Sequence, residues 1–97
     1  MALTITQQGQ VLVFRGELDR ETLLDYLPFT LLKSLSGQVV FDFSALTNVD
    51  SAGLAWLIEQ LALAQQRDLQ LQIRQAPAQL LSLARVSAVA DLLPIVD

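Results

Sequence analysis

The sequence predicts a two-layer α/β domain in which helices lie mainly on one face of a four-stranded mixed sheet, in the order ββαβαβα. Three observations support this fold class. Short segments with alternating apolar and polar side chains are separated by leucine-rich segments with helical spacing. Helices connect the last three strands, so these strands should run parallel, with right-handed crossovers that place the helices on one side. The length of 97 residues suits a single domain, residues 1–97.

The first predicted elements are a β-hairpin and a helix. Leu3 to Gln7 and Val11 to Arg15 both alternate apolar and polar residues, and a short glycine-containing turn separates them. Leucines recur at helical spacing between Glu21 and Leu35, and Asp19 is placed to serve as the N-cap of this helix. Pro28 should kink or split the helix, because proline removes a backbone donor.

A third strand and the clearest helix of the chain follow. Gln38 to Phe43 alternates apolar and polar residues again, and a loop from Ser44 to Asp50 should come after it. The helix should run from about Ser51 to Arg67. Its core stripe is predicted at the spacing i, i+3, i+4, i+7 and consists of Leu54, Leu57, Ile58 and Leu61.

The last predicted elements are a strand and a helix. Leu69 to Arg74 alternates strictly, so the polar face of the sheet should carry Gln70, Gln72 and Arg74. Pro77 should open the last helix, because proline suits the first helical turn. Residues 87–97 are largely apolar, and no element is predicted for them.

The helix beginning at Ser51 also carries a candidate partner strip. At about 100° per residue, the side opposite the predicted core stripe bears Ala52, Trp56, Gln60 and Leu63. Large apolar side chains on that side would add nothing to the core, whereas buried aromatic anchors dominate the energies of protein interfaces. The strip is therefore predicted to bind a partner protein. The alternative is that Trp56 folds sideways onto a neighbouring helix, since tryptophan is usually largely buried.

The composition excludes several classes of function. The chain has no cysteine and no histidine, which argues against thiolate chemistry and zinc sites, and we predict no cofactor and no metal. The net charge of −4 and the scattered basic residues argue against nucleic-acid binding. The amino terminus lacks signal-peptide features, and no apolar run approaches the roughly 18 residues needed to insert into a membrane. We expect a cytoplasmic protein.

The composition also indicates a partner. Hydrophobic residues make up 53% of the chain and charged residues 16%, whereas about a quarter of an average globular chain is charged. A small domain has a high ratio of surface to volume, so part of this apolar content should lie at the surface.

The most informative motif is the segment from Asn48 to Leu54. It delivers Asp50 and Ser51 to the start of a long helix, where free backbone N–H groups and a partial positive charge would favour a phosphate on an exposed hydroxyl. The simpler interpretation is that Asp50 or Ser51 caps the helix. Carboxylates near the carboxyl ends of strands could likewise suggest Mg²⁺ or acid/base catalysis, but capping and loop polarity are favoured for Glu17, Asp19, Asp42 and Asp50, because no lysine, histidine or nucleophile joins them.

Three segments in this order resemble STAS domains, a family that includes the anti-sigma factor antagonists. They are Gly16-Glu17-Leu18-Asp19, the strand Val39 to Ser44, and Val49-Asp50-Ser51-Ala52-Gly53-Leu54. The resemblance covers nearly the whole chain and implies a non-enzymatic interaction module. In antagonists of this kind, a partner kinase phosphorylates the serine that matches Ser51. Those proteins often carry two adjacent hydroxyl residues before the glycine, whereas this chain has Ala52.

The length, the segment Asp50 to Ala55 and the Leu-Leu-Pro ending are more similar to the MlaB-type STAS proteins. This resemblance implies a subunit that binds the ATPase of a phospholipid-transporting ABC complex, and through it the permease. Such a subunit supports assembly and activity of the complex in outer-membrane lipid asymmetry, and it lies peripheral to the inner membrane through its partner. The residue matching Ser51 would then sit at the ATPase contact. The alternative is an anti-sigma factor antagonist that is switched by phosphorylation of Ser51 by an anti-sigma factor kinase.

Overall fold

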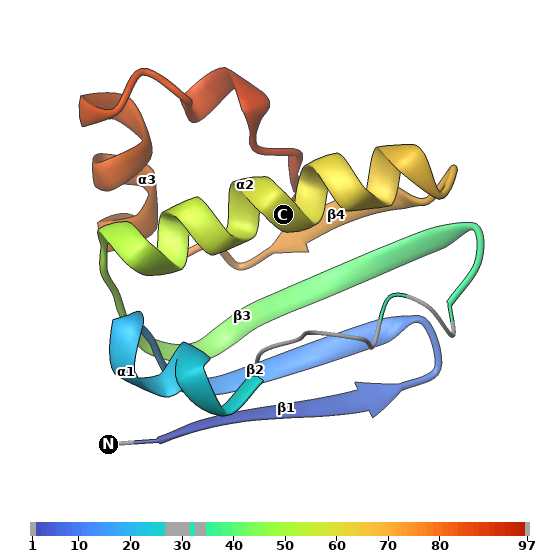
Figure 1. Ribbon diagram of the computed structural model, residues 1–97, viewed down its shortest axis with the longest axis horizontal. Coiled ribbons are helices and arrows are strands. Elements are labelled where there is room, and N and C mark those ends of the chain that lie inside the picture. Colours follow the sequence, from blue (N-terminus) through green and yellow to red (C-terminus); the bar gives the residue numbers. More distant parts are fainter. Residues whose placement is uncertain (1, 27–31, 33–34, 97) are drawn as a thin grey trace.

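The computed structural model describes residues 2–26, 32 and 35–96, which form an α/β fold (Figure 1). The strands of the described residues form one five-stranded sheet in sequence order: β1 (Leu3–Gln8), β2 (Val11–Leu18), β3 (Gln38–Val49), β4 (Gln70–Arg74) and β5 (Ile95–Val96). The α-helices of this part of the chain are α1 (Arg20–Leu23), α2 (Ser51–Gln66) and α3 (Ala78–Val86), and short 3₁₀ turns are η1 (Leu24–Tyr26) and η3 (Ala90–Leu92).

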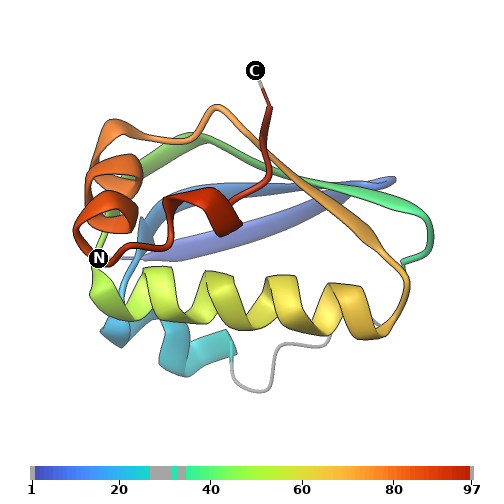
Figure 2. The same cartoon turned by 90° about the horizontal axis from the view of Figure 1, so that it is seen from above.

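The sheet confirms the predicted hairpin and the predicted mixture of strand directions. β1 pairs antiparallel with β2, and the remaining neighbours pair parallel. Figure 2 shows α1 and α2 on one side of the sheet, with α3 near the end of the sheet at which α2 begins. The predicted outward residues of β4 stay at the surface, since Gln70 is exposed and Gln72 and Arg74 are half-buried. The helices therefore cover mainly one face.

Two strand predictions were wrong. The strand count is five because Ile95–Val96 pairs with β4, and a two-residue strand is too short to show alternation. The predicted loop from Ser44 to Asp50 is mostly strand, because β3 continues to Val49 alongside β2. The register between these strands shifts twice, and such irregularities interrupt the alternation that identifies a strand in sequence.

The first helical segment is short in the described residues. The helix α1 ends at Leu23 and continues as the single turn η1, so helical structure here begins one residue before the predicted start at Glu21. Asp19 is the N-cap, as predicted. The predicted kink at Pro28 lies outside the described residues.

The orientation of α2 differs from the prediction. Leu54 and Leu57 are buried as expected, but Ile58 and Leu61 are only partly buried. The buried face is instead turned toward Trp56, which is 5% exposed and packs on two rings of the sheet. The Trp56 ring lies 6.3 Å from Phe41 in a stacked arrangement and 5.9 Å from Phe14 in an edge arrangement.

The prediction that Trp56, Gln60 and Leu63 form an outward strip is therefore wrong. Trp56 belongs to the core, Gln60 is 3% exposed, and Leu63 is half-buried. The prediction failed because α2 is apolar almost all round and Glu59 is its one charged residue, so the leucines alone could not define the buried side. None of the helices among the described residues is long and apolar enough to cross a membrane.

Candidate functional site

The predicted motif lies where the carboxyl ends of β2 and β3 meet the first residues of α1 and α2. Leu18 and Val49, the last residues of the two strands, are neighbours in the parallel register. The backbone N–H of Asp50 donates to the Leu18 carbonyl at 3.3 Å, which joins the start of α2 to the end of β2. The side chain of Gln79, from α3, accepts from the Val49 N–H at 2.9 Å. Segments distant in the sequence therefore meet at this edge.

Asp50 holds the starts of the two helices together. One carboxylate oxygen accepts from the Gly53 N–H at 2.8 Å and caps α2, as the simpler interpretation of the motif predicted. The other oxygen accepts from the Arg20 N–H, at the start of α1, at 3.2 Å. Both oxygens of Asp50 are thus occupied by backbone donors, which assigns this side chain a structural role.

Gly53 allows the first turn of α2 to lie directly against β2. A Cβ atom at this position would overlap the backbone carbonyl of Leu18. The glycine of the motif is therefore required by close packing, because its backbone has ordinary helical geometry and no positive φ.

Asp19 and Thr22 form a capping box at the start of α1. The Asp19 carboxylate accepts from the Thr22 N–H at 2.9 Å, and the Thr22 hydroxyl accepts from the Asp19 N–H at 3.1 Å. The same hydroxyl donates to the Glu17 carbonyl at 2.8 Å, which ties the box to the end of β2. The hydrogen bond from the Thr22 backbone is the main reason why the pKa of Asp19 lies below its usual value.

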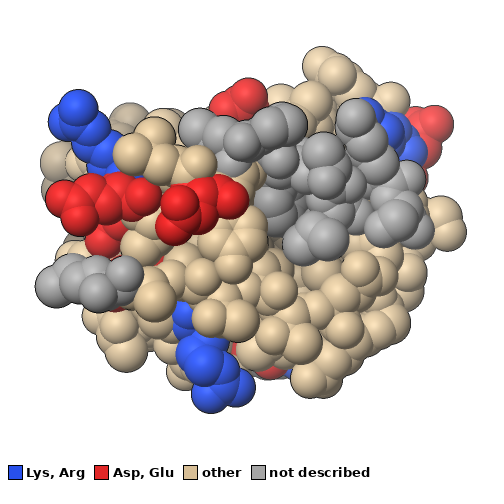
Figure 3. Space-filling model, turned by 60° about the horizontal axis from the view of Figure 1, so that its bottom comes forward, with Lys and Arg blue, Asp and Glu red and all other residues tan. Residues whose placement is uncertain are grey.

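Four acidic side chains surround a shallow depression of about 390 Å³ at this edge, together with Arg20 and Asn48; the acidic residues are Glu17, Asp19, Glu21 and Asp50. Figure 3 shows acidic side chains gathered at the end of the molecule where α1 lies in Figure 1. Within the described residues, no three carboxylates come together as a group that could hold a metal ion. Asp42, the remaining acidic residue that the sequence analysis considered, does not line this depression.

Asp42 is paired on the sheet instead. Its carboxylate accepts from the Arg74 guanidinium at 2.9 Å across the β3–β4 pair and from the Ser44 N–H at 2.9 Å. Partial burial opposes its ionisation, but these donors outweigh it and lower the pKa of Asp42 below the usual value. This arrangement assigns Asp42 to the stability of the sheet.

Ser51 is exposed at the first position of α2, and it lines one of two apolar grooves that flank this helix. One groove, which we call the α1–α2 groove, has a volume of about 340 Å³ and is lined by Arg20, Leu23, Leu24, Ala52, Ala55, Trp56 and Glu59. The other lies between α2 and residues 87–96, which follow α3 and which we call the tail, and we name it the α2–tail groove. It has a volume of about 310 Å³ and is lined by Ser51, Leu54, Ala55, Ile58, Ser87 and Val89. Ala55, exposed one turn beyond Ser51, borders both grooves.

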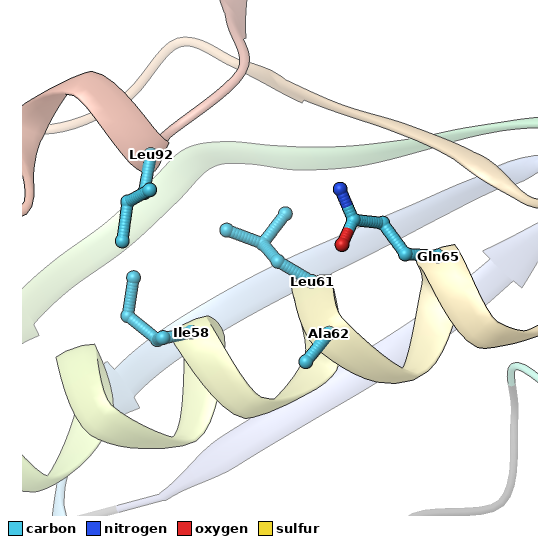
Figure 4. A pocket seen from close by; sticks show the side chains of 5 residues that line it. All are labelled: Ile58, Leu61, Ala62, Gln65 and Leu92. Atoms are coloured by element: carbon cyan, nitrogen blue, oxygen red, sulfur yellow. The ribbon is translucent and has the colours of Figure 1, made fainter.

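A smaller hollow continues along α2 beneath the tail. It has a volume of about 160 Å³, and Figure 4 shows Leu92 of the tail pointing toward Ile58 of α2 across it. Leu92 is 59% exposed and Leu24, beside the α1–α2 groove, is 69% exposed. Exposed leucines therefore lie on both sides of α2.

The sequence located part of this surface. It identified Ser51, Asp50, Ala52 and Asp19 at one edge, and the structure brings them together there. It missed Leu24 and Leu92, and it placed Trp56 on the wrong side of α2. The signal for them in the sequence was its composition, since the excess of apolar residues predicted apolar side chains at the surface but not which ones.

Comparison with known proteins identifies the family. The chain matches the family model of the MlaB STAS domain over residues 1–95. It belongs to the MlaB-type STAS domain family. Proteins of the STAS type are typically binding or regulatory modules that interact with partner proteins and are not enzymes. No curated protein matches the chain significantly.

A solved structure supports the same fold. The anti-sigma factor antagonist SpoIIAA in its unphosphorylated form matches with a TM-score of 0.67 at 14% identity. The match covers 98% of this chain and 87% of the other. At this identity the match establishes a common fold, and it agrees with the STAS assignment.

Proposed function

We propose that this protein is a non-enzymatic subunit that binds the ATPase subunit of an Mla-type, phospholipid-transporting ABC complex and supports its assembly and activity. In this role the ATPase subunit links it to the permease, and it is peripheral to the inner membrane. The observation that carries the proposal is the exposed start of α2 in an MlaB-type STAS domain, where Ser51 lines one apolar groove and Ala55 borders that groove and a second one, both left open by the fold.

The residues at the start of α2 favour a binding role over a catalytic one. Asp50 is engaged by two backbone N–H groups, whereas the neighbouring Ser51 and Ala55 are small and exposed. Small residues on a helix allow a partner to approach its backbone closely, and apolar grooves on either side supply area that gains from losing contact with water.

Substitution of Ser51 by arginine tests the proposal. Ser51→Arg should weaken binding to the purified ATPase subunit by about tenfold or more, because a bulky charge would occupy the centre of the contact. The melting temperature should hardly change, since surface substitutions usually alter stability by less than about 0.5 kcal/mol. Ser36→Arg is the matched control, because Ser36 is also an exposed serine and lies near the amino end of β3, away from α2 in the sequence. Unchanged affinity of Ser51→Arg for the ATPase would refute the proposed contact.

The exposed hydroxyl of Ser51 favours a second candidate, an anti-sigma factor antagonist switched by phosphorylation of this serine. The first turn of α2 would stabilise a phosphate, although Asp50 already occupies the Gly53 N–H and further carboxylates lie nearby. Incubation with an anti-sigma factor kinase and ATP distinguishes the candidates. Phosphate on wild-type protein and none on Ser51→Ala would support the second candidate, and absence of phosphate together with ATPase binding would support the first.

A further inference from the structure

The α2 wall of the α1–α2 groove is a stripe of side chains with helical spacing. It consists of Ala52, Ala55, Trp56 and Glu59, at the spacing i, i+3, i+4, i+7. This spacing defines one straight stripe about two turns long, or roughly 10 Å. Two of the four side chains are alanines, so a second helix could approach this stripe closely and pack at about 8 Å between axes.

The opposite wall of the groove carries an apolar side chain that the fold does not use. Leu24 is 69% exposed, whereas its neighbour Leu23 is 6% exposed and belongs to the core. A leucine beside an open apolar groove gains from burial only when something fills the groove. The groove is therefore an open apolar surface bordered by Leu24 and Glu59.

The charge around the groove is negative. Glu59 lies in the lining, and the groove adjoins the acidic depression through Arg20, a residue common to both. Among the described residues of the two linings, Arg20 is the one basic residue, against five carboxylates: Glu17, Asp19, Glu21, Asp50 and Glu59. The α2–tail groove is similar in size, but none of the described residues in its lining is charged. Within the part of the chain that the structure describes, the α1–α2 groove thus differs from the α2–tail groove in combining an apolar floor with an acidic border.

We propose that the α1–α2 groove binds a basic amphipathic helix of the partner protein. The apolar face of that helix lies on Ala52 and Ala55, against Leu24, and its lysine or arginine side chains pair with Glu59 and the acidic depression. The inference rests on the proposed function for the identity of the partner, which is the ATPase subunit. It adds which groove is used and what chemistry the docking segment must have.

Trp56 provides a direct probe of the groove. It is the one tryptophan of the sequence and lies in the groove lining, so its emission reports occupation of the groove. The ligand is a synthetic peptide of leucine, alanine and lysine, about 18 residues long so that it can form a helix, with leucines at i, i+3, i+4, i+7. A matched peptide has glutamate in place of lysine. The basic peptide should shift Trp56 emission and bind at least about tenfold more tightly than the acidic one.

Two substitutions test the walls of the groove. Glu59→Lys should weaken the basic peptide by about tenfold and reduce the dependence of its affinity on salt. Asp91→Lys, at an exposed position in η3, changes the net charge equally and serves as the control. Leu24→Asp should also weaken binding, without lowering the melting temperature, because Leu24 is largely exposed. Equal effects of Glu59→Lys and Asp91→Lys, or equal affinity for both peptides, would overturn the proposal.

The same variants separate this inference from the proposed function. If the ATPase subunit binds wild-type protein and Glu59→Lys equally well, the groove assignment is wrong and the ATPase partnership stands. If the basic peptide binds with the predicted variant effects and the ATPase subunit does not bind, the groove assignment stands and the partner is a different protein.

Discussion

The two faces of α2 differ in how much of the fold depends on them. On the buried face, Gly53 lies against the end of β2, Trp56 packs on the aromatic core, and Leu57 is fully buried. On the other face, Ser51, Ala55 and Glu59 are exposed and border grooves that the fold leaves open. The residues of the two faces alternate along the same turns of α2, so they differ in the direction in which they point from the helix axis.

This difference teaches that residues of one motif can have separate roles. Asp50 and Gly53 set the position of the helix, through a cap and a close backbone contact, whereas Ser51 and Ala52 between them line the open grooves at which we propose that a partner binds. A substitution on the buried face should therefore reduce stability, and one on the exposed face should reduce binding.

The largest expected effect is that of Trp56→Ala. Removal of a ring that packs on Phe14 and Phe41 should lower the free energy of unfolding by about 3–5 kcal/mol, as for other large aromatic truncations in a core. Urea unfolding followed by circular dichroism measures it. A loss below about 1 kcal/mol would show that the ring contributes little to the core, and the two faces would then not differ as described.

Gly53→Ala should have the second-largest effect on stability. Whether it stabilises or destabilises the protein shows whether helix propensity or close packing dominates at this position. Helix propensity alone predicts that alanine stabilises this position by up to about 1 kcal/mol. The overlap of the new methyl group with the Leu18 carbonyl should instead destabilise the protein by about 1–3 kcal/mol.

Ala55→Gly, on the exposed face of the same helix, is the control for helix propensity. It should lose about 1 kcal/mol through propensity alone. Stabilisation by Gly53→Ala would contradict close packing between α2 and β2.

Most of the fold could be predicted because strand alternation assigns each side chain to a face. The hairpin, β4 and the caps at Asp19 and Asp50 depend on local patterns of a few residues. The extension of β3 could not be predicted, because its pairing with β2 passes through register shifts that only the neighbouring strand determines. The strand β5 depends on β4 in the same way.

The candidate site could be predicted only where local structure determines it. Ser51 follows a capping residue, so its place at the first position of a helix is a local property. The direction in which Trp56 points is a tertiary property, because α2 has apolar residues on nearly every side and the aromatic rings of β2 and β3 select one of them. A local sequence pattern also does not show which leucines, such as Leu24, are exposed.

Asp50→Ala should have a smaller effect than either core substitution. It removes one acceptor for the Gly53 N–H and one for the Arg20 N–H, at an exposed edge, and should lower the free energy of unfolding by about 1 kcal/mol. Asp50→Asn keeps an acceptor oxygen and should lose less. An Asp50→Ala protein that keeps full stability would show that the Asp50 side chain contributes nothing to the free energy of unfolding.

The smallest expected effect is a response to acid at the start of α1, on the wall of the α1–α2 groove. The pKa of Asp19 is lowered in the folded protein, chiefly by the hydrogen bond from the Thr22 N–H, so the stabilisation by this cap is present at neutral pH. It is lost as the pH falls below the usual aspartate value of 3.8. The apolar contacts of Leu57 contain no titrating group and should persist.

Hydrogen exchange of single amides, followed by NMR as the pH is lowered, tests this difference. After correction for the intrinsic exchange rate, the Thr22 amide should lose protection below pH 3.8 while the Leu57 amide keeps it. Asp19→Asn retains an acceptor that does not titrate in this range, so its Thr22 amide should show no such step. Simultaneous loss at both amides would mean that α1 and α2 unfold as one unit. The wall of the groove would then be as firmly held as the buried face of α2.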